Sequence, residues 1–438
     1  MFSGRISNCY DSHVHWLATG ELADRLSLHE LKSPEQVAHL KVQPHCFRGD
    51  WLLGYGWNHN LWEQTEFPHR HHLDAAFGDK PVAFSRVDGH ALWANTAALM
   101  RAGLMSGIVN DPPGGRILRD EKGVATGVLI DKAGALIENL IPKRTDQEAG
   151  RCLLKGMQIF NQAGFTHIRD LTCDHQQWHE ATKLDLSGLL TMAVEQYFSV
   201  EEGTDFNTAL QLAIAARQVP TKHLRVMGLK VFVDGALGSE GAWLSCDYAS
   251  GTGHGLKLMD MAELKEVMIE TWNNQLELAV HIIGDEAAHQ TMLIYNEVFN
   301  RGISGSLHLE HAELLRPETV ALMTGRNVRC HLQPCHWLSD KVWLDKKVGG
   351  LKQYAFPWRA LQEAQVAFDF GSDSPIERPS VSDNLRAIHE SGDQGIPRLL
   401  GDGTKYHTHP DLAWVPNTYT VFADGTPTEV VFAGEHIL

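Results

Sequence analysis

The sequence predicts an α/β protein built on a (β/α)8 TIM barrel, with a large insertion after strand 1 and a reduced side β-sandwich. From about residue 151 onward, short apolar runs alternate with longer amphipathic segments, as in repeated βα units around a parallel sheet. Seven apolar runs follow one another there, and an eighth, weaker run lies far upstream. Polar side chains recur at the ends of these runs, and such barrels carry their active sites at the carboxyl ends of the strands.

Eight segments are expected as barrel strands, and they are residues 6–15, 165–170, 190–196, 226–234, 276–283, 306–311, 328–333 and 366–373. Four helices carry end signals, which are Gly164 after residues 151–163, Asp260 with Glu263 before 261–274, Asp285 before 286–299 and Pro317 at the start of 317–324. A long stretch of chain separates the first strand from the second, which predicts an insertion at that point.

The expected domains follow from this order. Residues 11–16 and 151–390 are expected to form the barrel, and residues 17–150 an insertion after strand 1 that covers the barrel mouth. Residues 1–10 and 410–438 are expected as vestigial segments of a side β-sandwich. A length of 438 residues suits one large domain with additions, because α/β barrels routinely exceed the usual domain size.

The insertion and the C-terminal region have weaker patterns. Residues 81–87 have a strand-like pattern and residues 92–102 a helix-like one. After Asp373 the apolar periodicity decays into loops rich in turn residues. It resumes as two short alternating runs, 418–422 and 429–433, which predict a β-hairpin packed outside the barrel.

The composition excludes several classes of protein. Hydrophobic residues make up 43% and charged residues 21%, which are ordinary values for a globular chain. The formal net charge of -16 disfavours a nucleic-acid partner, because it repels a phosphate backbone. No run approaches 18 apolar residues, so no membrane segment is expected. The seven cysteines are scattered and odd in number, which favours a reducing, cytoplasmic location.

Histidine is unusually frequent, with 25 in the chain. The ligand-type side chains at expected strand ends are His13, His15, Lys230, His281, His311 and Asp373. The period of two along a strand turns His13 and His15 to the same face, where both can bind one ion. Lys230 lies inside an apolar run, and a buried ammonium needs a carboxylate, a metal-bridging modification or a lowered pKa. Each residue alone is a weak signal, but together they predict a metal site at one rim of the barrel.

A second pair of histidines has the same spacing as His13 and His15. His407 and His409 lie in an expected loop, so the pair is interpreted as a coincidence at the surface. It is therefore not assigned to the metal site.

Nine stretches resemble a known family, and they are DSHVHW (11–16), GYGWNHNLW (54–62), SRVDGHALWANTAAL (85–99), DPPGGRILRD (111–120), KVFVDGALGS (230–239), AVHIIGD (279–285), LEHAELL (309–315), HLQPCH (331–336) and GSDSPIE (371–377). Through them the chain resembles the amidohydrolase superfamily of metal-dependent hydrolases, from about Asp11 to about Glu377. Within it, the chain is similar to amidohydrolase family 3, the branch of the N-substituted formamide deformylases and the YtcJ-like proteins.

The resemblance implies a (β/α)8 barrel with one or two ions of a Zn²⁺-type metal. By position it implies that His13 and His15 are the HxH ligands, Lys230 a carboxylated bridging lysine, His281 and His311 the ligands of strands five and six, and Asp373 the aspartate of strand eight. Imidazole nitrogens and carboxylate oxygens suit Zn²⁺. A carbamate on Lys230 converts a buried cation into an anionic bridge.

The chemistry expected of such a site is hydrolysis. Bound metal lowers the pKa of its water towards about 7, and Asp373 can accept a proton and pass it to a departing nitrogen. The predicted enzyme is a metal-dependent amidohydrolase that cleaves a C–N bond, other than a peptide bond, in a small molecule. Two alternatives stay open, an ester, lactone or phosphoester hydrolase with the same site, and a non-catalytic metal-binding relative. Whether the chain is a homodimer also stays open.

Five further residues are candidates for substrate binding. Asp88 and His90 resemble the family's DGH motif and are expected either to fold over the barrel mouth or to form a turn at a strand end. Gln333 and His336 follow strand seven and can bind a substrate carbonyl or oxyanion. Trp57 lines an apolar pocket wall or packs in a core.

Two acidic residues stand where this branch often has arginine. They are Glu240, after the GALGS stretch, and Glu286, after the GD stretch. If arginines hold substrate anions in relatives, these carboxylates favour a different or cationic substrate here.

Overall fold

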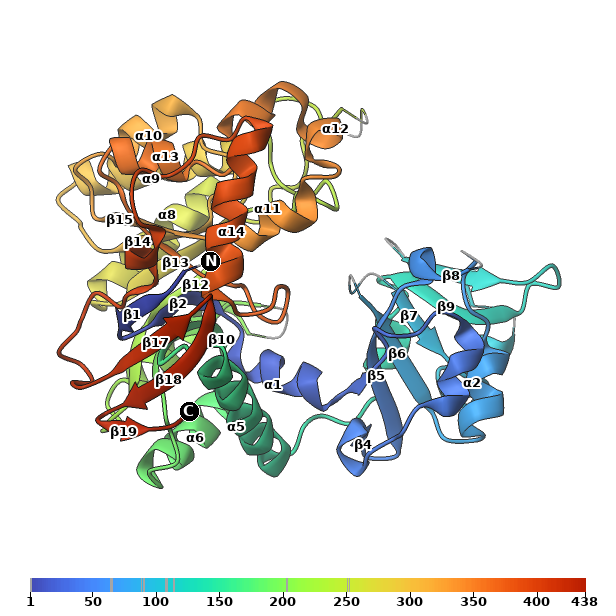
Figure 1. Cartoon of the computed structure of the whole chain (residues 1–438). Coiled ribbons are helices and arrows are strands. Elements are labelled where there is room, and N and C mark those ends of the chain that lie inside the picture. The colour runs from blue at the N-terminus through green and yellow to red at the C-terminus, as the bar shows by residue number, and fades with distance from the viewer. Residues whose placement is uncertain are drawn as a thin grey trace. The chain divides into compact units, whose positions relative to one another are not determined.

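The computed structural model describes the chain from residue 2 to residue 438, with the exception of residues 64, 65, 88, 90, 107, 108, 113, 114, 202, 203, 250 and 252. The chain divides into two units (Figure 1). Unit 1 comprises Met1–Thr19 and Leu153–Leu438, and unit 2 comprises Gly20–Cys152.

Unit 1 contains a parallel sheet of eight strands that follow one another in chain order. The strands are β2 (Tyr10–Val14), β10 (His167–Cys173), β11 (Ala193–Ser199), β12 (Leu224–Phe232), β13 (Glu277–Ile282), β14 (Leu307–His311), β15 (Val328–Leu332) and β16 (Ala367–Phe370). A parallel bridge between Val14 and Ser374 joins the two ends of the sheet. The predicted (β/α)8 barrel is therefore confirmed.

The barrel strands read as apolar runs because both of their faces are buried. All seven residues of β11 are buried, and all five of β2. The expected segment 6–15 is divided in two, since Gly4–Ser7 forms the separate strand β1. The other expected strands are present in the expected order, with ends displaced by up to three residues.

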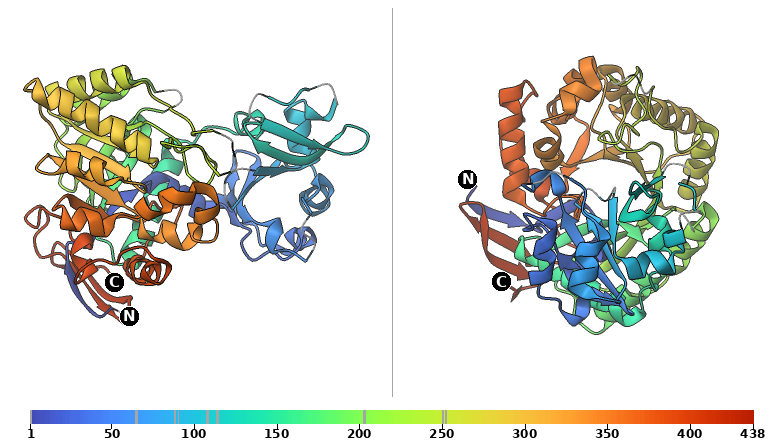
Figure 2. Two further views of the ribbon diagram at one scale, coloured as in Figure 1. Left: turned by 90° about the horizontal axis from the view of Figure 1, so that it is seen from above. Right: turned by 90° about the vertical axis from the view of Figure 1, so that its right-hand side faces the viewer.

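Helices lie around the strands of the barrel (Figure 2). They include α5 (Asp146–Gln162), α6 (His175–Leu186), α7 (Phe206–Ala216), α8 (Met261–Asn273), α9 (Asp285–Asn300), α10 (Pro317–Met323), α13 (Trp358–Glu363) and α14 (Val381–Ser391). The helices α11 (Pro334–Asp340) and α12 (Leu344–Val348) follow β15 directly. No helix in the described part of the chain is long and apolar enough to cross a membrane.

Two helix predictions were wrong in detail. Asp285 does not cap α9, because its carboxylate accepts a hydrogen bond from the N–H of Ser245, 3.0 Å away, and Gly284 is the N-cap. Helix α14 lies where only loops were expected after Asp373. Ser380 caps α14 by accepting a hydrogen bond from the N–H of Asp383, and the helix buries one face, which includes Val381 and Ile388.

The chain ends meet in a four-stranded antiparallel sheet beside the barrel, in the order β1, β17 (Tyr419–Ala423), β18 (Thr426–Phe432) and β19 (Glu435–His436). The turn after α5 contacts this sheet. The carbonyl of Gly164 accepts a hydrogen bond from the Thr420 hydroxyl, 2.6 Å away, and Gly164 has a left-handed φ of 92°. Gly164 therefore ends the helix and leaves room for the sheet.

Unit 2 is built on its own sheet, in the order β3 (Leu26–Ser27), β5 (Trp51–Trp57), β6 (Val82–Arg86), β7 (Ala91–Ala94), β9 (Ala125–Asp131) and β8 (Gly115–Arg119), with β4 (Phe47–Arg48) paired to β5. The helix expected at 92–102 begins only at α3 (Thr96–Arg101). Its first residues form β7 instead, because they pair with β6 and β9. The position of this insertion over the barrel mouth stays a prediction.

We expect Gly164→Ala to lower the free energy of unfolding by about 2–4 kcal/mol. About 1 kcal/mol comes from a left-handed alanine, and about 1–3 kcal/mol from overpacking. A Cβ at Gly164 would lie 2.8 Å from Cζ of Phe422 and 3.0 Å from Cγ2 of Thr420. The control is Gly188→Ala, which has a φ of 69° and no atom within 4 Å of the added Cβ. Urea unfolding measures both variants, and equal losses would contradict contact between the sheet and this turn.

Candidate metal centre

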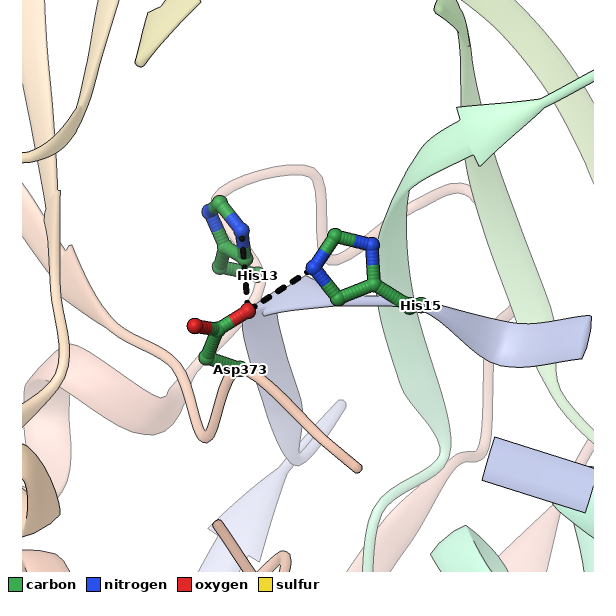
Figure 3. Close-up of side chains that lie close together, drawn as sticks. All are labelled: His13, His15 and Asp373. Carbon is green, nitrogen blue, oxygen red and sulfur yellow. Dashed lines mark hydrogen bonds and ion pairs between the residues drawn. The ribbon is translucent and has the colours of Figure 1, made fainter. Parts of the chain in front are cut away.

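The HxH pair and Asp373 form a compact cluster at the carboxyl end of the barrel (Figure 3). Oδ1 of Asp373 lies 2.8 Å from Nε2 of His15 and 3.3 Å from Nε2 of His13. The three ligand atoms all lie within 4.8 Å of one another, so the group could hold a metal ion. The two histidines flank Val14, the last residue of β2, and the alternation of the strand turns both to Asp373.

Barrel closure brings these residues together. The N–H of Asp373 donates to the carbonyl of His13 at 2.8 Å, and the N–H of His15 donates to the carbonyl of Ser374 at 2.8 Å. Asp373 has a left-handed φ of 59°, and His311 one of 70°. Such conformations are unfavourable for residues with a Cβ and are retained where the surrounding structure enforces them, typically at functional sites.

His311 and His336 also lie close to the Asp373 carboxylate. With Asp373 they form a second group whose ligand atoms lie within 4.8 Å of one another. Nε2 of His336, on α11, is 3.4 Å from Oδ2 of Asp373, and Nδ1 of His336 is 3.1 Å from Oε1 of Glu313. Oε1 of Gln333 lies 3.0 Å from Nδ1 of His311. Both residues predicted after strand seven, Gln333 and His336, are therefore in the cluster.

The imidazole of His281 packs against the imidazole of His311, and among the described residues it forms no ion pair with the Asp373 carboxylate. Its ring centroid is 4.5 Å from that of His311, and its Nε2 lies 3.9 Å from Oδ1 of Asp234. Burial, and next the charge of Lys230, lower the pKa of His281 to about 3. The imidazole is therefore neutral, as a metal ligand must be.

Lys230 is buried in β12 with 1% of its surface exposed. Burial lowers its pKa to about 8, with Glu310 and Asp373 acting in the opposite direction. Its Nζ lies 5.0 Å from the ring centroid of Phe232, and among the described residues it makes no ion pair within 4 Å. A buried amine without an ion pair is costly to charge, which agrees with its lowered pKa.

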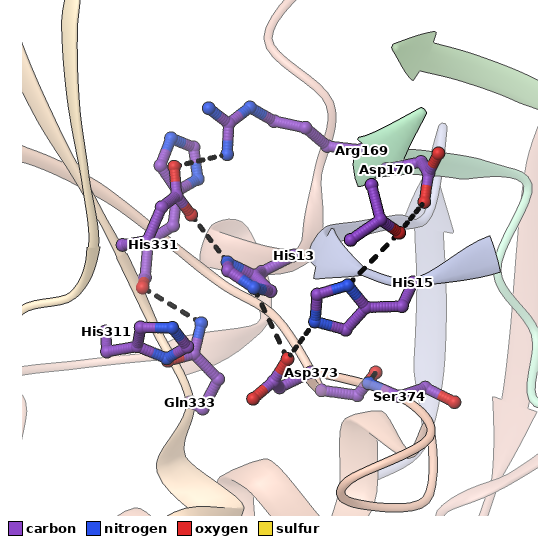
Figure 4. Close-up of polar contacts among 12 residues, drawn as sticks. His13, His15, Arg169, Asp170, His311, His331, Gln333, Asp373 and Ser374 are labelled. Carbon is purple, nitrogen blue, oxygen red and sulfur yellow. Dashed lines mark hydrogen bonds and ion pairs between the residues drawn. The ribbon is translucent and has the colours of Figure 1, made fainter. Parts of the chain in front are cut away.

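Sequence reasoning missed Glu310, which contacts Nδ1 of His13, whereas Nε2 of the same ring faces Asp373. Figure 4 shows the polar contacts around His13, His15 and Asp373. Oε2 of Glu310 lies 2.6 Å from Nδ1 of His13, and Oε1 accepts a hydrogen bond from Nη1 of Arg169 at 2.7 Å. All three side chains are at most 1% exposed. Burial acts to raise the pKa of Glu310, but Arg169 and the histidines hold this pKa well below its usual range. A signal for this ion pair was present in the sequence, because a charged residue lies inside an apolar strand in both cases. Arg169 lies in β10 and Glu310 in β14, as Lys230 lies in β12.

Trp57 belongs to unit 2. It is fully buried in the core of unit 2, packs against Trp62 and Trp93, and donates from its indole N–H to the carbonyl of Phe84 at 2.8 Å. This burial favours the packing alternative. Asp88 and His90 lie outside the described residues.

The structure corrects the expectation that His407 and His409 lie at the surface. Only 0% and 1% of their surfaces are exposed. Nδ1 of His407 lies 3.2 Å from the carbonyl of Tyr10, the first residue of β2, so this segment covers the opposite end of the barrel.

Glu240 and Glu286 do not offer free charge to a cationic substrate. The carboxylate of Glu240 pairs with Lys347 at 3.0 Å, and that of Glu286 with Arg316 at 2.9 Å. The negative charges of Glu240 and Glu286 are therefore neutralised by basic side chains of the protein itself.

The residues present fit a divalent metal ion. Nε2 of His281 is buried and makes no hydrogen bond within the described residues, and Nε2 of His13 and Nε2 of His336 are buried 3.3 and 3.4 Å from the Asp373 carboxylate. Buried polar atoms are rarely left in this state, because each unsatisfied atom costs about 1–3 kcal/mol. Imidazoles around a carboxylate are a donor set typical of Zn²⁺ and similar ions.

Comparison with known proteins identifies the family. A family model described as the amidohydrolase family matches residues 10–389. The chain belongs to the amidohydrolase family. The putative amidohydrolase YtcJ of Bacillus subtilis (strain 168) is 28% identical over 394 residues, which cover 86% of this chain and 70% of that protein. The N-substituted formamide deformylase of Arthrobacter pascens is 23% identical over 385 residues, which cover 83% of this amidohydrolase and 69% of the deformylase.

Solved structures have the same fold. The crystal structure of an uncharacterized metal-dependent hydrolase from Pyrococcus furiosus matches with a TM-score of 0.71 and 24% identity, over 91% of this amidohydrolase and 78% of that chain. An uncharacterized metal-dependent hydrolase from Pyrococcus horikoshii OT3 matches with a TM-score of 0.72 and 23% identity, over 94% and 79% of the two chains. These likenesses agree with the barrel described above.

We expect Arg169→Met to lower the free energy of unfolding by about 3–5 kcal/mol, because it leaves the buried carboxylate of Glu310 without its cation. Arg359→Met is the control, since its ion pair with Glu363 is partly exposed and such pairs contribute about 0.5 kcal/mol. Chemical denaturation of the metal-free protein measures both. Losses of similar size would show that Arg169 does not balance Glu310.

Proposed function

We propose that this amidohydrolase is a metal-dependent enzyme that hydrolyses an amide-type C–N bond of a small molecule, with Asp373 as the general base and then the general acid. The observation that carries the proposal is the position of the Asp373 carboxylate, which faces the two HxH histidines with one oxygen and His336 with the other. His13, His15 and Asp373 would hold the metal, with His311 and His336 beside them.

The state of Asp373 supports its role as a proton acceptor. Although burial acts to raise it, the charge and hydrogen bond of His13 and the hydrogen bonds of His15 and His336 hold the pKa of Asp373 well below its usual range. The side chain is therefore a carboxylate at neutral pH, and it can take a proton from water and return it to a departing nitrogen. A bound divalent cation supplies Lewis acidity, since it lowers the pKa of water towards about 7 and polarises a carbonyl.

Gln333 is the candidate for orienting the substrate carbonyl. It is 2% exposed, and its amide is held at both ends, since Oε1 lies 3.0 Å from Nδ1 of His311 and Nε2 donates to the carbonyl of His331 at 3.0 Å. A donor fixed in this way costs little reorganisation during a reaction. Its place after β15 puts it at the same barrel rim as Asp373.

The proposal that a C–N bond is the target draws on the relatives of this chain. One of them is named an N-substituted formamide deformylase, which supports a C–N bond as the target here. We propose Zn²⁺ as the metal because of the histidine and carboxylate donors, and carboxylation of Lys230 because its buried amine has no anionic partner among the described residues.

The seven cysteines are all unpaired, which supports a cytoplasmic location.

We expect Asp373→Asn to lower kcat/KM for the best substrate by about 10²–10⁴-fold, the usual contribution of a general acid–base group. Wild type is first assayed with Zn²⁺ in excess against N-acyl and N-formyl amides, esters, lactones and phosphoesters. The control is Asp369→Asn, which alters an aspartate within β16 that pairs with Arg329 at 2.5 Å. This control is expected to keep wild-type kcat/KM.

Each outcome of this assay has one meaning. Turnover confined to amides that falls in Asp373→Asn alone supports the proposal. Turnover confined to esters, lactones or phosphoesters would replace the C–N bond by another target. A metal-loaded wild type with no turnover of any compound would favour a non-catalytic metal-binding protein.

A further inference from the structure

We propose that a cavity at the amino ends of the barrel strands binds a small amino carboxylate, with the carboxylate of the ligand on Arg169 and its ammonium group on Glu277. This site is separate from the candidate metal centre, which lies at the carboxyl ends of the same strands. The inference goes beyond the proposed function, because it concerns a second site and a second ligand.

The cavity has a volume of about 430 Å³ and lies within unit 1. Sites for small molecules usually have volumes of about 300–1,000 Å³. Its walls include Tyr10, Glu277 and Leu307, which are the first residues of β2, β13 and β14. Asp373 follows the carboxyl end of β16, so the cavity and the candidate metal centre lie at opposite ends of the barrel.

Arg169 lines the cavity with part of its guanidinium group unused. Nη1 donates to Oε1 of Glu310 at 2.7 Å, whereas Nε and Nη2 are buried and donate to no carboxylate or carbonyl among the described residues. The ring of Tyr197 lies against the guanidinium group, with its centroid 4.0 Å from Cζ. Nε and Nη2 form one edge of the guanidinium group, and two donors in this arrangement match the two oxygens of a carboxylate.

His331 adds a second buried group without a partner to the wall of the cavity. Its Nε2 lies 2.8 Å from Nδ1 of His308, and its Nδ1 makes no hydrogen bond among the described residues. Burial, and next the charge of Arg169, lower the pKa of His331 well below its ordinary value, so the ring is neutral. Buried polar atoms are rarely left without a partner, and a ligand in the cavity would supply one.

Glu277 gives the cavity an anionic oxygen that is free to accept. Oε2 accepts a hydrogen bond from the Tyr197 hydroxyl and lies 3.1 Å from Nε2 of His308, whereas Oε1 makes no hydrogen bond among the described residues. The side chain is 27% exposed. Burial acts to raise the pKa of Glu277, but His308 and Tyr197 lower it to about 2, so the group is a carboxylate at neutral pH. A carboxylate oxygen of this kind suits the N–H donors of an ammonium group.

The other charged side chains of the cavity already have partners. Arg225 pairs with Asp411 at 2.8 Å, and Arg329 pairs with Asp369 at 2.5 Å. Both oxygens of Glu195 are occupied by hydrogen bonds within the protein. These groups therefore do not compete for the ligand.

The two free groups carry opposite charges and contact the same tyrosine. Arg169 lies against the ring of Tyr197, and Glu277 accepts from its hydroxyl. A ligand with a single charge would bind only one of the two groups and would add a net charge to a partly buried cavity, which is unfavourable. An amino carboxylate carries both charges and is neutral overall, so it matches the two groups together.

The test is the binding of L-alanine, propionate and ethylamine to the full-length protein, measured by isothermal titration calorimetry. Propionate lacks the ammonium group of L-alanine, and ethylamine lacks its carboxylate. We expect L-alanine to bind about tenfold more tightly than either, because each contact with a charged group contributes at least this factor. The titration is repeated after treatment with a chelator, since amines and carboxylates also bind metal ions, and we expect the affinity to be unchanged.

Glu277→Gln keeps the shape of the side chain and removes its charge. It is expected to lower the affinity for L-alanine about 10–100-fold. The matched control is Glu195→Gln in the same cavity, because the oxygens of Glu195 are already occupied by Tyr10 at 2.8 Å and His409 at 3.1 Å. This control is expected to keep wild-type affinity. The comparison of the three compounds on wild type needs no variant, so it holds even if Glu277→Gln does not fold.

The remaining outcomes would overturn the inference. Equal affinities for L-alanine and propionate, or wild-type affinity in Glu277→Gln, would show that Glu277 does not bind an ammonium group. Binding that is lost after treatment with the chelator would assign the ligand to the metal centre. Absence of binding by all three compounds would mean that the cavity holds only water. The proposed function is tested by turnover and is unaffected by these results.

Discussion

Closure of the barrel between β16 and β2 is the constraint on which the site depends. Two backbone hydrogen bonds of 2.8 Å, from Asp373 to His13 and from His15 to Ser374, join segments at opposite ends of the sequence. Once this seam forms, strand alternation turns both HxH histidines to one carboxylate. The other strands add their terminal side chains to the same rim because all of them are parallel.

The interior beneath that rim carries charge that the fold must balance. Glu310 is fully buried between His13 and Arg169, so a single carboxylate both orients the imidazole of His13 and compensates a buried guanidinium. Buried ion pairs of this kind add little net stability, because desolvation offsets much of their attraction. Their value here is positional, since they hold the cluster in one geometry. The left-handed backbone at His311 and Asp373 fits the same interpretation.

Local patterns predicted much of the fold, and they failed where distant residues compete. The number and order of the barrel strands follow from apolar runs that are buried on both faces. The cap expected at Asp285 is absent because Ser245, from a preceding loop, takes its carboxylate. The free charge expected at Glu240 and Glu286 is neutralised by Lys347 and Arg316. No spacing along the chain encodes these contacts.

Local patterns predict that ligand-type side chains end successive parallel strands, because strand periodicity and barrel topology follow from nearby residues in the chain. Which of these side chains face the same carboxylate follows only from the folded chain. Asp373 faces His13 and His15 with one oxygen and His336 with the other, whereas His281 lies nearer Asp234. That choice depends on side-chain directions set by backbone turns after each strand, which pack against residues far away in the chain.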